Sequence, residues 1–205
     1  MPTKISIIVV LCSFILSSVN TLAQKEWKLV KDKNEIKIFT RSIEGTKLKA
    51  YKGEAMISVN IEQLYNFLIN VGNYHEWAYE CKESTLISKV DDIEYIYYSI
   101  YKMPWPFYDR DIVTKMDISS RNGEEYIIIL ETKLIEGIRE EKKNLVRIPE
   151  YYQKTTLIKQ DNISVKMIIE GYLDPGGKIP IWIINMFLAD GPYESIINIK
   201  EILEQ

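Results

Sequence analysis

The sequence predicts a single α+β domain in which an antiparallel β-sheet precedes a long C-terminal helix. The chain of 205 residues is long enough for one sizeable core and too short for two comfortable ones. From residue 82 to residue 173 apolar side chains alternate with period two, and after residue 179 a helical period replaces this alternation. The 14 tyrosines also favour strands, because flat and β-branched side chains pack well on a pleated surface.

Residues 1–23 differ in character from the rest of the chain. Lys4 precedes an apolar run of about a dozen residues, and the segment ends on Thr21-Leu22-Ala23. This pattern is typical of a secretory signal peptide cleaved after Ala23, with an uncleaved N-terminal anchor as the alternative. We therefore expect a mature domain of residues 24–205 that is exported, to the periplasm in a Gram-negative bacterium and otherwise by secretion.

Charge and cysteine content exclude several classes of protein. Without residues 1–23 the chain has 25 basic and 29 acidic side chains, which argues against a nucleic-acid partner. Cys81 is then the only cysteine, so no intrachain disulfide forms. One cysteine and one histidine, His75, predict no metal site, and we expect no cofactor. Catalytic motifs such as HExxH and GxSxG are also missing, so we expect no catalytic residue and no enzyme.

The first elements follow from changes in hydrophobic period. Residues 26–41 predict two strands around a turn at 32–34, and residues 47–58 predict a third strand. Apolar residues then recur every three or four positions, which predicts a helix over residues 60–71 with Asn60 as its N-cap. After this helix we expect an irregular or short helical segment at residues 73–77.

A long run of strands follows, divided by turn residues. The alternating segments lie near residues 82–90, 93–102, 110–118, 124–134, 145–160 and 163–173. Residues 137–144 are charged and poor in apolar side chains, so we expect a solvated loop or a short helix there.

Residues 180–203 predict one long terminal helix. Pro180 suits its first turn. One face carries Trp182, Met186, Ala189, Tyr193, Ile196 and Leu203. We expect Gly191 and Pro192 to kink or loosen its middle, because proline removes one hydrogen bond and clashes with the preceding turn.

Two stretches resemble the START family, the steroidogenic-acute-regulatory-protein-related lipid transfer domains. The first contains Pro104-Trp105-Pro106 followed by Arg110-Asp111, and the second runs from Gly177 through Pro180 to Gly191-Pro192. The resemblance covers about residues 25–205. It implies a helix-grip fold, in which a strongly curved antiparallel sheet wraps the C-terminal helix around an internal apolar cavity. It also implies binding and carriage of a lipid or other hydrophobic small molecule, with transient contact at a membrane surface.

Strand phase predicts which side chains face this cavity. Arg110 is in phase with Ile112 and Thr114 and is expected to point inward, where a buried guanidinium needs a carboxylate or a lipid headgroup. Glu131 is one possible partner, although the opposite row of its strand is equally apolar. The alternative is that Arg110 braces the turn at Pro104-Trp105-Pro106.

Aromatic residues supply the other candidates. Tyr98 is expected to face the cavity, with the row of Tyr95, Tyr97 and Tyr101 outside the sheet. Trp105 is expected either to form a rigid turn or to contact the ligand. Trp182, Met186 and Tyr193 on the terminal helix are further cavity candidates, with ordinary core packing as the alternative.

The expected joint at Gly191-Pro192 suggests a gate in the cavity wall. The alternative is that it only bends the helix around the sheet. Two other functions are open: an enzyme of the cyclase/aromatase or hydrolase type, whose hallmark would be a strongly perturbed pKa in the cavity, and a ligand-sensing adaptor.

Overall fold

The computed structural model describes residues 26–122 and 126–205, except for the side chains of residues 121, 122, 186 and 187. The predicted signal peptide lies outside the described residues, and its cleavage stays a prediction.

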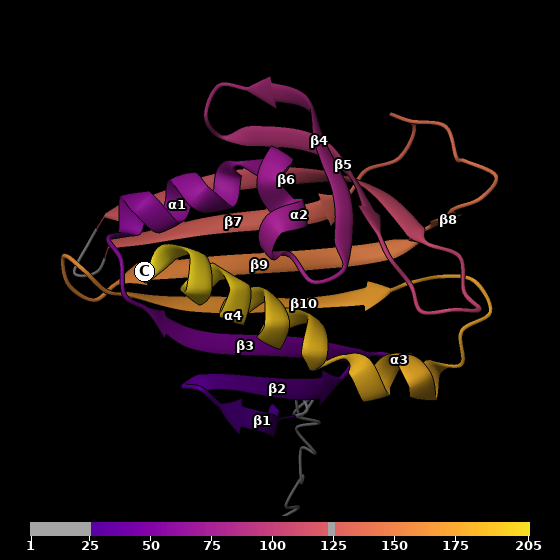
Figure 1. Ribbon diagram of the computed structural model, residues 1–205, viewed down its shortest axis with the longest axis horizontal. Helices are drawn as coiled ribbons and strands as arrows, with labels where there is room; N and C mark the ends of the chain where they lie inside the picture. Colours follow the sequence, from indigo (N-terminus) through magenta and orange to yellow (C-terminus); the bar gives the residue numbers. More distant parts are fainter. Residues whose placement is uncertain (1–25, 123–125) are drawn as a thin grey trace, which may run out of the picture.

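One ten-stranded sheet forms the body of the molecule (Figure 1). Its strands are β1 (Lys28–Lys33), β2 (Ile36–Ser42), β3 (Lys49–Ile57), β4 (Cys81–Val90), β5 (Glu94–Tyr101), β6 (Arg110–Asn122), β7 (Tyr126–Leu134), β8 (Val146–Arg147), β9 (Glu150–Lys159) and β10 (Val165–Asp174). Nine are antiparallel in the order β1-β2-β3-β10-β9-β7-β6-β5-β4, while the short β8 pairs in parallel with β6. The pairing of β3 with β10 joins the first meander to the later strands.

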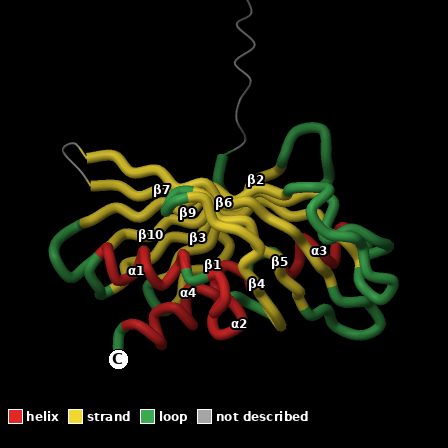
Figure 2. Tube along the Cα trace, turned by 90° about the horizontal axis from the view of Figure 1, so that it is seen from above, coloured by secondary structure: helices red, strands yellow, loops and turns green. Residues whose placement is uncertain are grey.

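The helices all lie on the concave side of the curved sheet (Figure 2). They are α1 (Ile61–Ile69), a 3₁₀ turn η1 (Val71–Asn73), α2 (Tyr74–Trp77), α3 (Ile181–Phe187) and α4 (Asp190–Leu203). The predicted α+β helix-grip fold is confirmed. Among the described residues, no helix is long and apolar enough to cross a membrane.

The close fit of α4 on the sheet depends on Gly53 in β3. A Cβ atom at this position would lie 2.9 Å from Cδ1 of Ile196 on α4, so glycine lets the helix lie directly on the strand. Ile196 and Ile199 are fully buried there, and they form part of one core between the sheet and the helices.

The helix near residue 60 begins as predicted. The side chain of Asn60 accepts a hydrogen bond from the backbone N–H of Gln63 at 2.8 Å, which satisfies one of the free donors of the first turn. The buried residues of this helix, which is α1, are Ile61, Leu64 and Leu68, and they hold it on the sheet.

The prediction of one continuous terminal helix is wrong. Leu188 and Ala189 separate α3 from α4, so the break lies just before Gly191-Pro192 rather than at it. Pro192 instead occupies the first turn of α4, where the missing N–H sacrifices no hydrogen bond within the helix. Proline therefore starts a new helix here and does not interrupt an old one.

The strand predicted over residues 145–160 is also two strands. Ile148 and Pro149 separate β8 from β9. Proline cannot donate to a strand ladder, which explains why the alternation continues through this point while the pairing does not.

Candidate ligand-binding cavity

A cavity of about 600 Å³ lies between the concave face of the sheet and the helices. Its walls come from β3, β5, β6, β9 and β10, from α2 and the segment after it, from the β5–β6 loop, and from α3 and the first turns of α4. This volume is within the usual range for small-molecule sites. The lining is mainly aliphatic and aromatic, so the cavity suits an apolar ligand.

Besides Tyr79, five tyrosines from four elements line the cavity. They are Tyr51 of β3, Tyr74 of α2, Tyr97 and Tyr101 of β5, and Tyr151 of β9. Burial is the main cause that raises the pKa of each phenol above its ordinary value near 10, so all five are neutral at physiological pH. Their hydroxyls provide polar chemistry without charge.

Two of these hydroxyls are engaged with one glutamine. Tyr51 and Tyr151 donate to Oε1 of Gln153 at 2.9 and 3.3 Å. Tyr74 donates instead to the backbone carbonyl of Leu68 at 2.9 Å. These bonds hold the rings at set positions in the wall.

An aromatic cluster forms one part of the wall. The ring of Tyr74 lies 4.8 Å from that of Trp77 and 5.3 Å from that of Tyr97, both edge-on. Tyr97 is paired across the sheet with Thr114 of β6, which also lines the cavity. Two buried polar atoms of this region, Trp77 Nε1 and Thr114 Oγ1, have no hydrogen-bond partner among the described residues.

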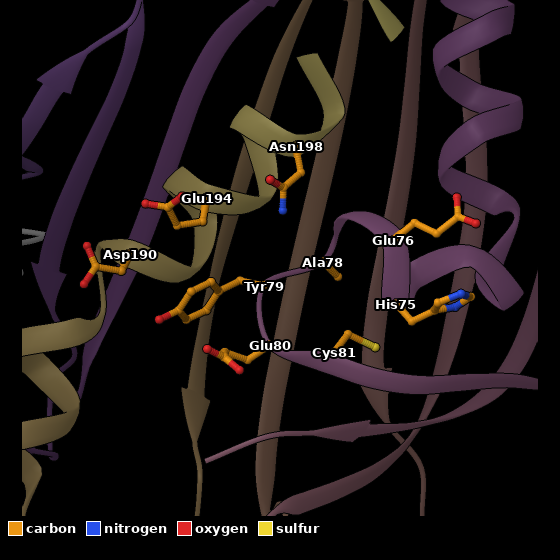
Figure 3. Close-up of a pocket in the computed structure, with 9 residues that line it drawn as sticks. All are labelled: His75, Glu76, Ala78, Tyr79, Glu80, Cys81, Asp190, Glu194 and Asn198. Carbon is orange, nitrogen blue, oxygen red and sulfur yellow. The ribbon is translucent and has the colours of Figure 1, made fainter. Parts of the chain in front are cut away.

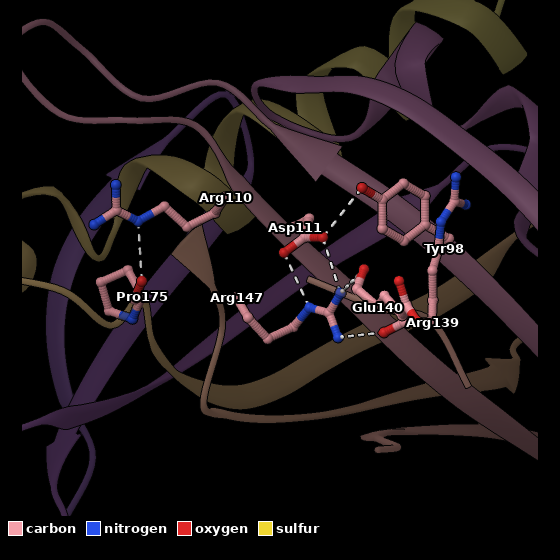
Figure 4. Close-up of polar contacts among 7 residues, drawn as sticks. All are labelled: Tyr98, Arg110, Asp111, Arg139, Glu140, Arg147 and Pro175. Carbon is pink, nitrogen blue, oxygen red and sulfur yellow. Dashed lines mark hydrogen bonds and ion pairs between the residues drawn. The ribbon is translucent and has the colours of Figure 1, made fainter. Parts of the chain in front are cut away.

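Arg110 lines the cavity, as its strand phase predicts, and is 2% exposed. Its Nε donates to the carbonyl of Pro175 at 2.9 Å (Figure 4). Its Nη2 donates to the carbonyl of Gly176 at 3.0 Å, and its Nη1 donates to the carbonyl of Tyr108. Desolvation lowers the pKa of the guanidinium. Arg110 thus links the β5–β6 loop to the turn before α3.

The predicted pairing of Arg110 with Glu131 is wrong. Glu131 does not line the cavity; it accepts a hydrogen bond from the hydroxyl of Tyr152 at 2.8 Å and lies 3.4 Å from the ammonium of Lys133. The other row of β7, with Ile128 and Leu130, is the one in the core. Both rows are apolar, so alternation alone does not distinguish the inner face from the outer.

The predicted orientation of β5 is also inverted. Tyr97 and Tyr101 line the cavity, whereas Tyr98 is fully buried on the other face. Its hydroxyl donates to Asp111 at 3.1 Å, and Arg139 covers its ring at 3.8 Å (Figure 4). Arg139 and Lys142 of the charged loop after β7 thus cover Tyr98.

The outer side of β6 contains a buried ion pair beside Tyr98. Asp111, 1% exposed, receives hydrogen bonds from Arg147 Nε and Nη2 at 2.9 and 3.0 Å. Burial, followed by the Asp111 charge, raises the pKa of Tyr98 to about 12. The bidentate pair fixes β8 against β6.

The terminal-helix candidates lie in different places. Trp182 is 67% exposed, and Tyr193 packs towards β1 and β2, with Asn34 donating to its hydroxyl at 3.1 Å and Lys31 lying 3.9 Å from its ring centre. Neither lines the cavity, and the Met186 side chain lies outside the described residues. Gly191 and Pro192 do line it.

The β5–β6 loop and α3 together form one part of the cavity wall, here called the mouth. Pro104 and Phe107 from the loop and Ile183 and Ile184 from α3 line this mouth. The same two segments carry strongly exposed aromatic side chains: Trp105 is 93% exposed, and Trp182 and Tyr108 are also in solvent. Trp105 points away from the cavity rather than into it.

A second, smaller cleft of about 430 Å³ lies outside the cavity wall (Figure 3). Asp190, Glu194 and Asn198 project into it from α4, and Ala78, Tyr79 and Glu80 line both the cleft and the cavity. No grouping of metal-binding side chains occurs in the described ranges 26–122 and 126–205.

Two hydrogen bonds join residues 77–79, at the end of α2 and just after it, to α4. The N–H of Tyr79 donates to Oγ of Ser195 at 3.0 Å, and Nδ2 of Asn198 donates to the carbonyl of Trp77 at 3.0 Å. This seam between α2 and α4 separates the cavity from the outer cleft.

The sequence interpretation missed most of the cavity wall. Tyr51, Tyr74, Tyr97, Tyr101 and Tyr151 were not candidates, because the 14 tyrosines were taken only to favour strands. These five come from four elements that only the fold brings together.

Comparison with known proteins agrees with this architecture. A model of the START domain matches residues 13–201. An uncharacterised protein of Pseudomonas aeruginosa is 27% identical over 186 residues, which cover 91% of this chain and 90% of that one. The phosphatidylcholine transfer protein of Bos taurus is 24% identical, with 83% and 80% covered. A solved STAR-related lipid transfer protein of Xanthomonas axonopodis superposes with a TM-score of 0.79 at 26% identity, covering 87% of this chain and 99% of that one.

Proposed function

Because this chain belongs to the START domain family, we propose that it binds a lipid or another hydrophobic small molecule in the cavity and carries it between membranes. The observation that carries the proposal is the apolar, tyrosine-lined cavity of about 600 Å³, roofed by α3 and α4. Burying the apolar surface of a lipid there removes it from water, which is favourable at roughly 25 cal/mol per Å².

Membrane contact is proposed to occur at the cavity mouth. Trp105 and Trp182 are exposed on the two segments that form the mouth. Tryptophan favours the membrane–water interface, because its ring is apolar and its N–H is polar. Docking by these side chains would place the open end of the cavity against the lipid surface.

The gate is proposed to be α3 with the first turn of α4. Gly191 and Pro192 belong to the wall, and the break at Leu188 and Ala189 offers a hinge just before them. The gate is held by the hydrogen bond from Nδ2 of Asn185 on α3 to the carbonyl of Lys47 at 3.0 Å and by the ion pair of Lys31 with Asp190 at 2.9 Å. Opening would require these two contacts to break.

Export is part of the same proposal. A signal peptide at residues 1–23 would place the carrier outside the cytoplasm, in the periplasm or as a secreted protein, where lipids must cross an aqueous space between membranes.

The test is native mass spectrometry of the exported protein, followed by extraction and identification of whatever it carries. We expect a lipid at one molecule per chain, and we expect the loaded protein to deliver it to acceptor vesicles. A purified protein that is empty and takes up no lipid from vesicles of mixed bacterial lipids would overturn the proposal.

The same experiment separates a carrier from a cyclase/aromatase-type enzyme. An enzyme would need an acid or base with a functional pKa in the cavity, whereas five of the six lining tyrosines, all but Tyr79, are held neutral by burial. A lipid recovered chemically unchanged after incubation supports the carrier, and conversion to a product supports the enzyme.

A further inference from the structure

The cavity occupies only one end of the concave side of the sheet. On β6 it is lined by the inward row Arg110, Ile112 and Thr114. Met116, the next residue of the same row, is 1% exposed and belongs to the packed core. The lined part of β6, from Arg110 to Thr114, is therefore about 13 Å long. Beyond it the space between the sheet and the helices is filled with side chains.

The neighbouring elements show the same inner limit. On β10 the cavity is lined by Ile169, whereas Met167 of the same row is fully buried in the core. On α4 it is lined by Ser195, whereas Ile196 is fully buried. A Cβ atom at Gly53 of β3 would lie 2.9 Å from Cδ1 of Ile196. A longer cavity would therefore require α4 to move away from β3.

Tyr51 fixes the cavity wall across the sheet. Its hydroxyl donates to Oε1 of Gln153 on β9 at 2.9 Å, so the side chain of this β3 residue crosses β10. A Cβ atom at Gly171 of β10 would lie 2.8 Å from this hydroxyl, so glycine provides the room for the crossing. Tyr151 donates to the same oxygen of Gln153 at 3.3 Å. These hydrogen bonds keep this part of the wall in place.

The volume of the cavity sets how much hydrocarbon it holds. A methylene group takes up about as much space as a water molecule in the liquid, roughly 30 Å³. A cavity of about 600 Å³ therefore holds roughly 20 such groups. One palmitoyl or stearoyl chain fits within this limit, whereas two palmitoyl chains need roughly 1000 Å³. The second chain would remain in water, where its apolar surface gains nothing from binding.

On the basis of the proposed carrier function, we infer that the ligand is a single-chain lipid whose apolar part has at most about 20 carbons. The walls formed by β3, β6, β9 and β10 and the contact of α4 with Gly53 set this limit. Lipids with two long acyl chains exceed it and are not carried.

The test is a competition between the protein and a bilayer. Lipid-stripped protein is incubated with dioleoylphosphatidylcholine vesicles that contain small, equal amounts of dipalmitoylphosphatidylcholine and of lysophosphatidylcholines with saturated chains from lauroyl to behenoyl. Mass spectrometry then quantifies each lipid on the re-isolated protein and in the vesicles. All compounds share one headgroup, so only the number and the length of the chains vary.

The ratio of protein-bound to vesicle-bound lipid should change little from lauroyl to stearoyl, because each methylene group leaves water in both places. Beyond about 20 carbons the ratio should fall roughly fourfold for each added methylene group, which leaves water only in the bilayer. Palmitoyl lysophosphatidylcholine should exceed dipalmitoylphosphatidylcholine in this ratio at least roughly tenfold.

The protein side of the limit is tested with Ile112→Ala. The substitution removes three carbon atoms from the cavity lining, so the chain length at which the ratio falls should increase by about two to four carbons. Val113→Ala is the matched control, because Val113 is the next residue on β6 and is also buried, but it does not line the cavity. If Ile112→Ala folds poorly, the chain series with the unmodified protein still tests the limit.

Two results would overturn the single-chain limit and leave the carrier proposal standing. One is a two-chain lipid bound as well as its lysophosphatidylcholine, whether from the vesicles or extracted from the exported protein. The other is a ratio that does not fall up to the behenoyl chain. Binding of none of these lipids, by a protein that also carries no cellular lipid, would remove both proposals.

Discussion

Arg110 at the start of β6 donates from Nε to the carbonyl oxygen of Pro175, 65 residues further along the chain, at 2.9 Å. Its other bonds reach Tyr108 and Gly176, so one buried side chain joins the two segments beside the cavity mouth. The guanidinium of Arg110 therefore connects the β5–β6 loop to the turn before α3.

Replacing Arg110 by alanine should lower the free energy of unfolding by about 3 kcal/mol, because three carbonyls lose a charged donor at a buried site. Urea denaturation measures this loss. Lys102→Ala, an exposed cation at the same mouth, is the control and should change stability little. Unchanged stability with lost ligand binding would instead mean that Arg110 contacts the ligand directly.

Replacing Trp105 by serine should slow lipid transfer between vesicles roughly tenfold, which is the effect of losing about 1.4 kcal/mol of interfacial attraction. Binding of a ligand free in solution should not change, because Trp105 is 93% exposed and lies outside the cavity wall. Ile163→Ser, at another strongly exposed apolar position in the β9–β10 turn, is the matched control. Equal transfer rates in all three proteins would contradict docking through Trp105.

Replacing Asp111 by asparagine should destabilise the fold by about 3 kcal/mol, since the substitution leaves the half-buried Arg147 without its anion. Asp117→Asn on the same strand is the control: Asp117 pairs with Lys115 at a partly exposed site, and its loss should cost under about 1 kcal/mol. Thermal unfolding of both variants gives the comparison. Similar losses in the two would show that burial of the Asp111 pair adds nothing.

The cavity tyrosines predict a sensitivity to alkaline pH. Burial raises the pKa of Tyr51, Tyr74, Tyr97, Tyr101 and Tyr151 above the value near 10 that they have when unfolded. The unfolded chain therefore releases these protons first, so their contribution to stability is complete below about pH 10 and declines as pH rises above it. Tyrosinate absorbance should rise together with unfolding monitored by circular dichroism. Titration of all tyrosines near pH 10 in a protein that stays folded would contradict this.

Much of the fold could be predicted from the chain because its signals are local. The cap at Asn60, the turn residues between strands and the row of Tyr51, Gly53, Ala55 and Ile57 on β3 all depend on neighbours within a few positions. The strand predicted over residues 145–160 and the terminal helix were the exceptions. The apolar face of the terminal helix continues through Leu188 and Ala189, so periodicity shows no boundary between α3 and α4.

The site was harder to predict than the fold. Arg110 was correctly placed inward, because its row contains Ile112 and Thr114 while the other contains Asp111. On β5 both rows are aromatic or aliphatic, and the prediction that Tyr98 rather than Tyr97 faces the cavity was wrong. The exposure of Trp105 and Trp182 could not be predicted either, because the sequence pattern does not distinguish an apolar side chain at the mouth from one in the core.

The sequence by itself determined the order of strands and helices, since hydrophobic period and turn residues act between close neighbours. The 14 tyrosines also favoured strands. The tertiary structure alone decided which row of β5 and of β7 faces inward, because that depends on which face α4 and the loop after β7 cover. The tertiary structure also placed Trp77, whose indole N–H has no partner among the described residues, beside Tyr74. It likewise gave the buried guanidinium of Arg110 the carbonyl of Pro175 as a partner.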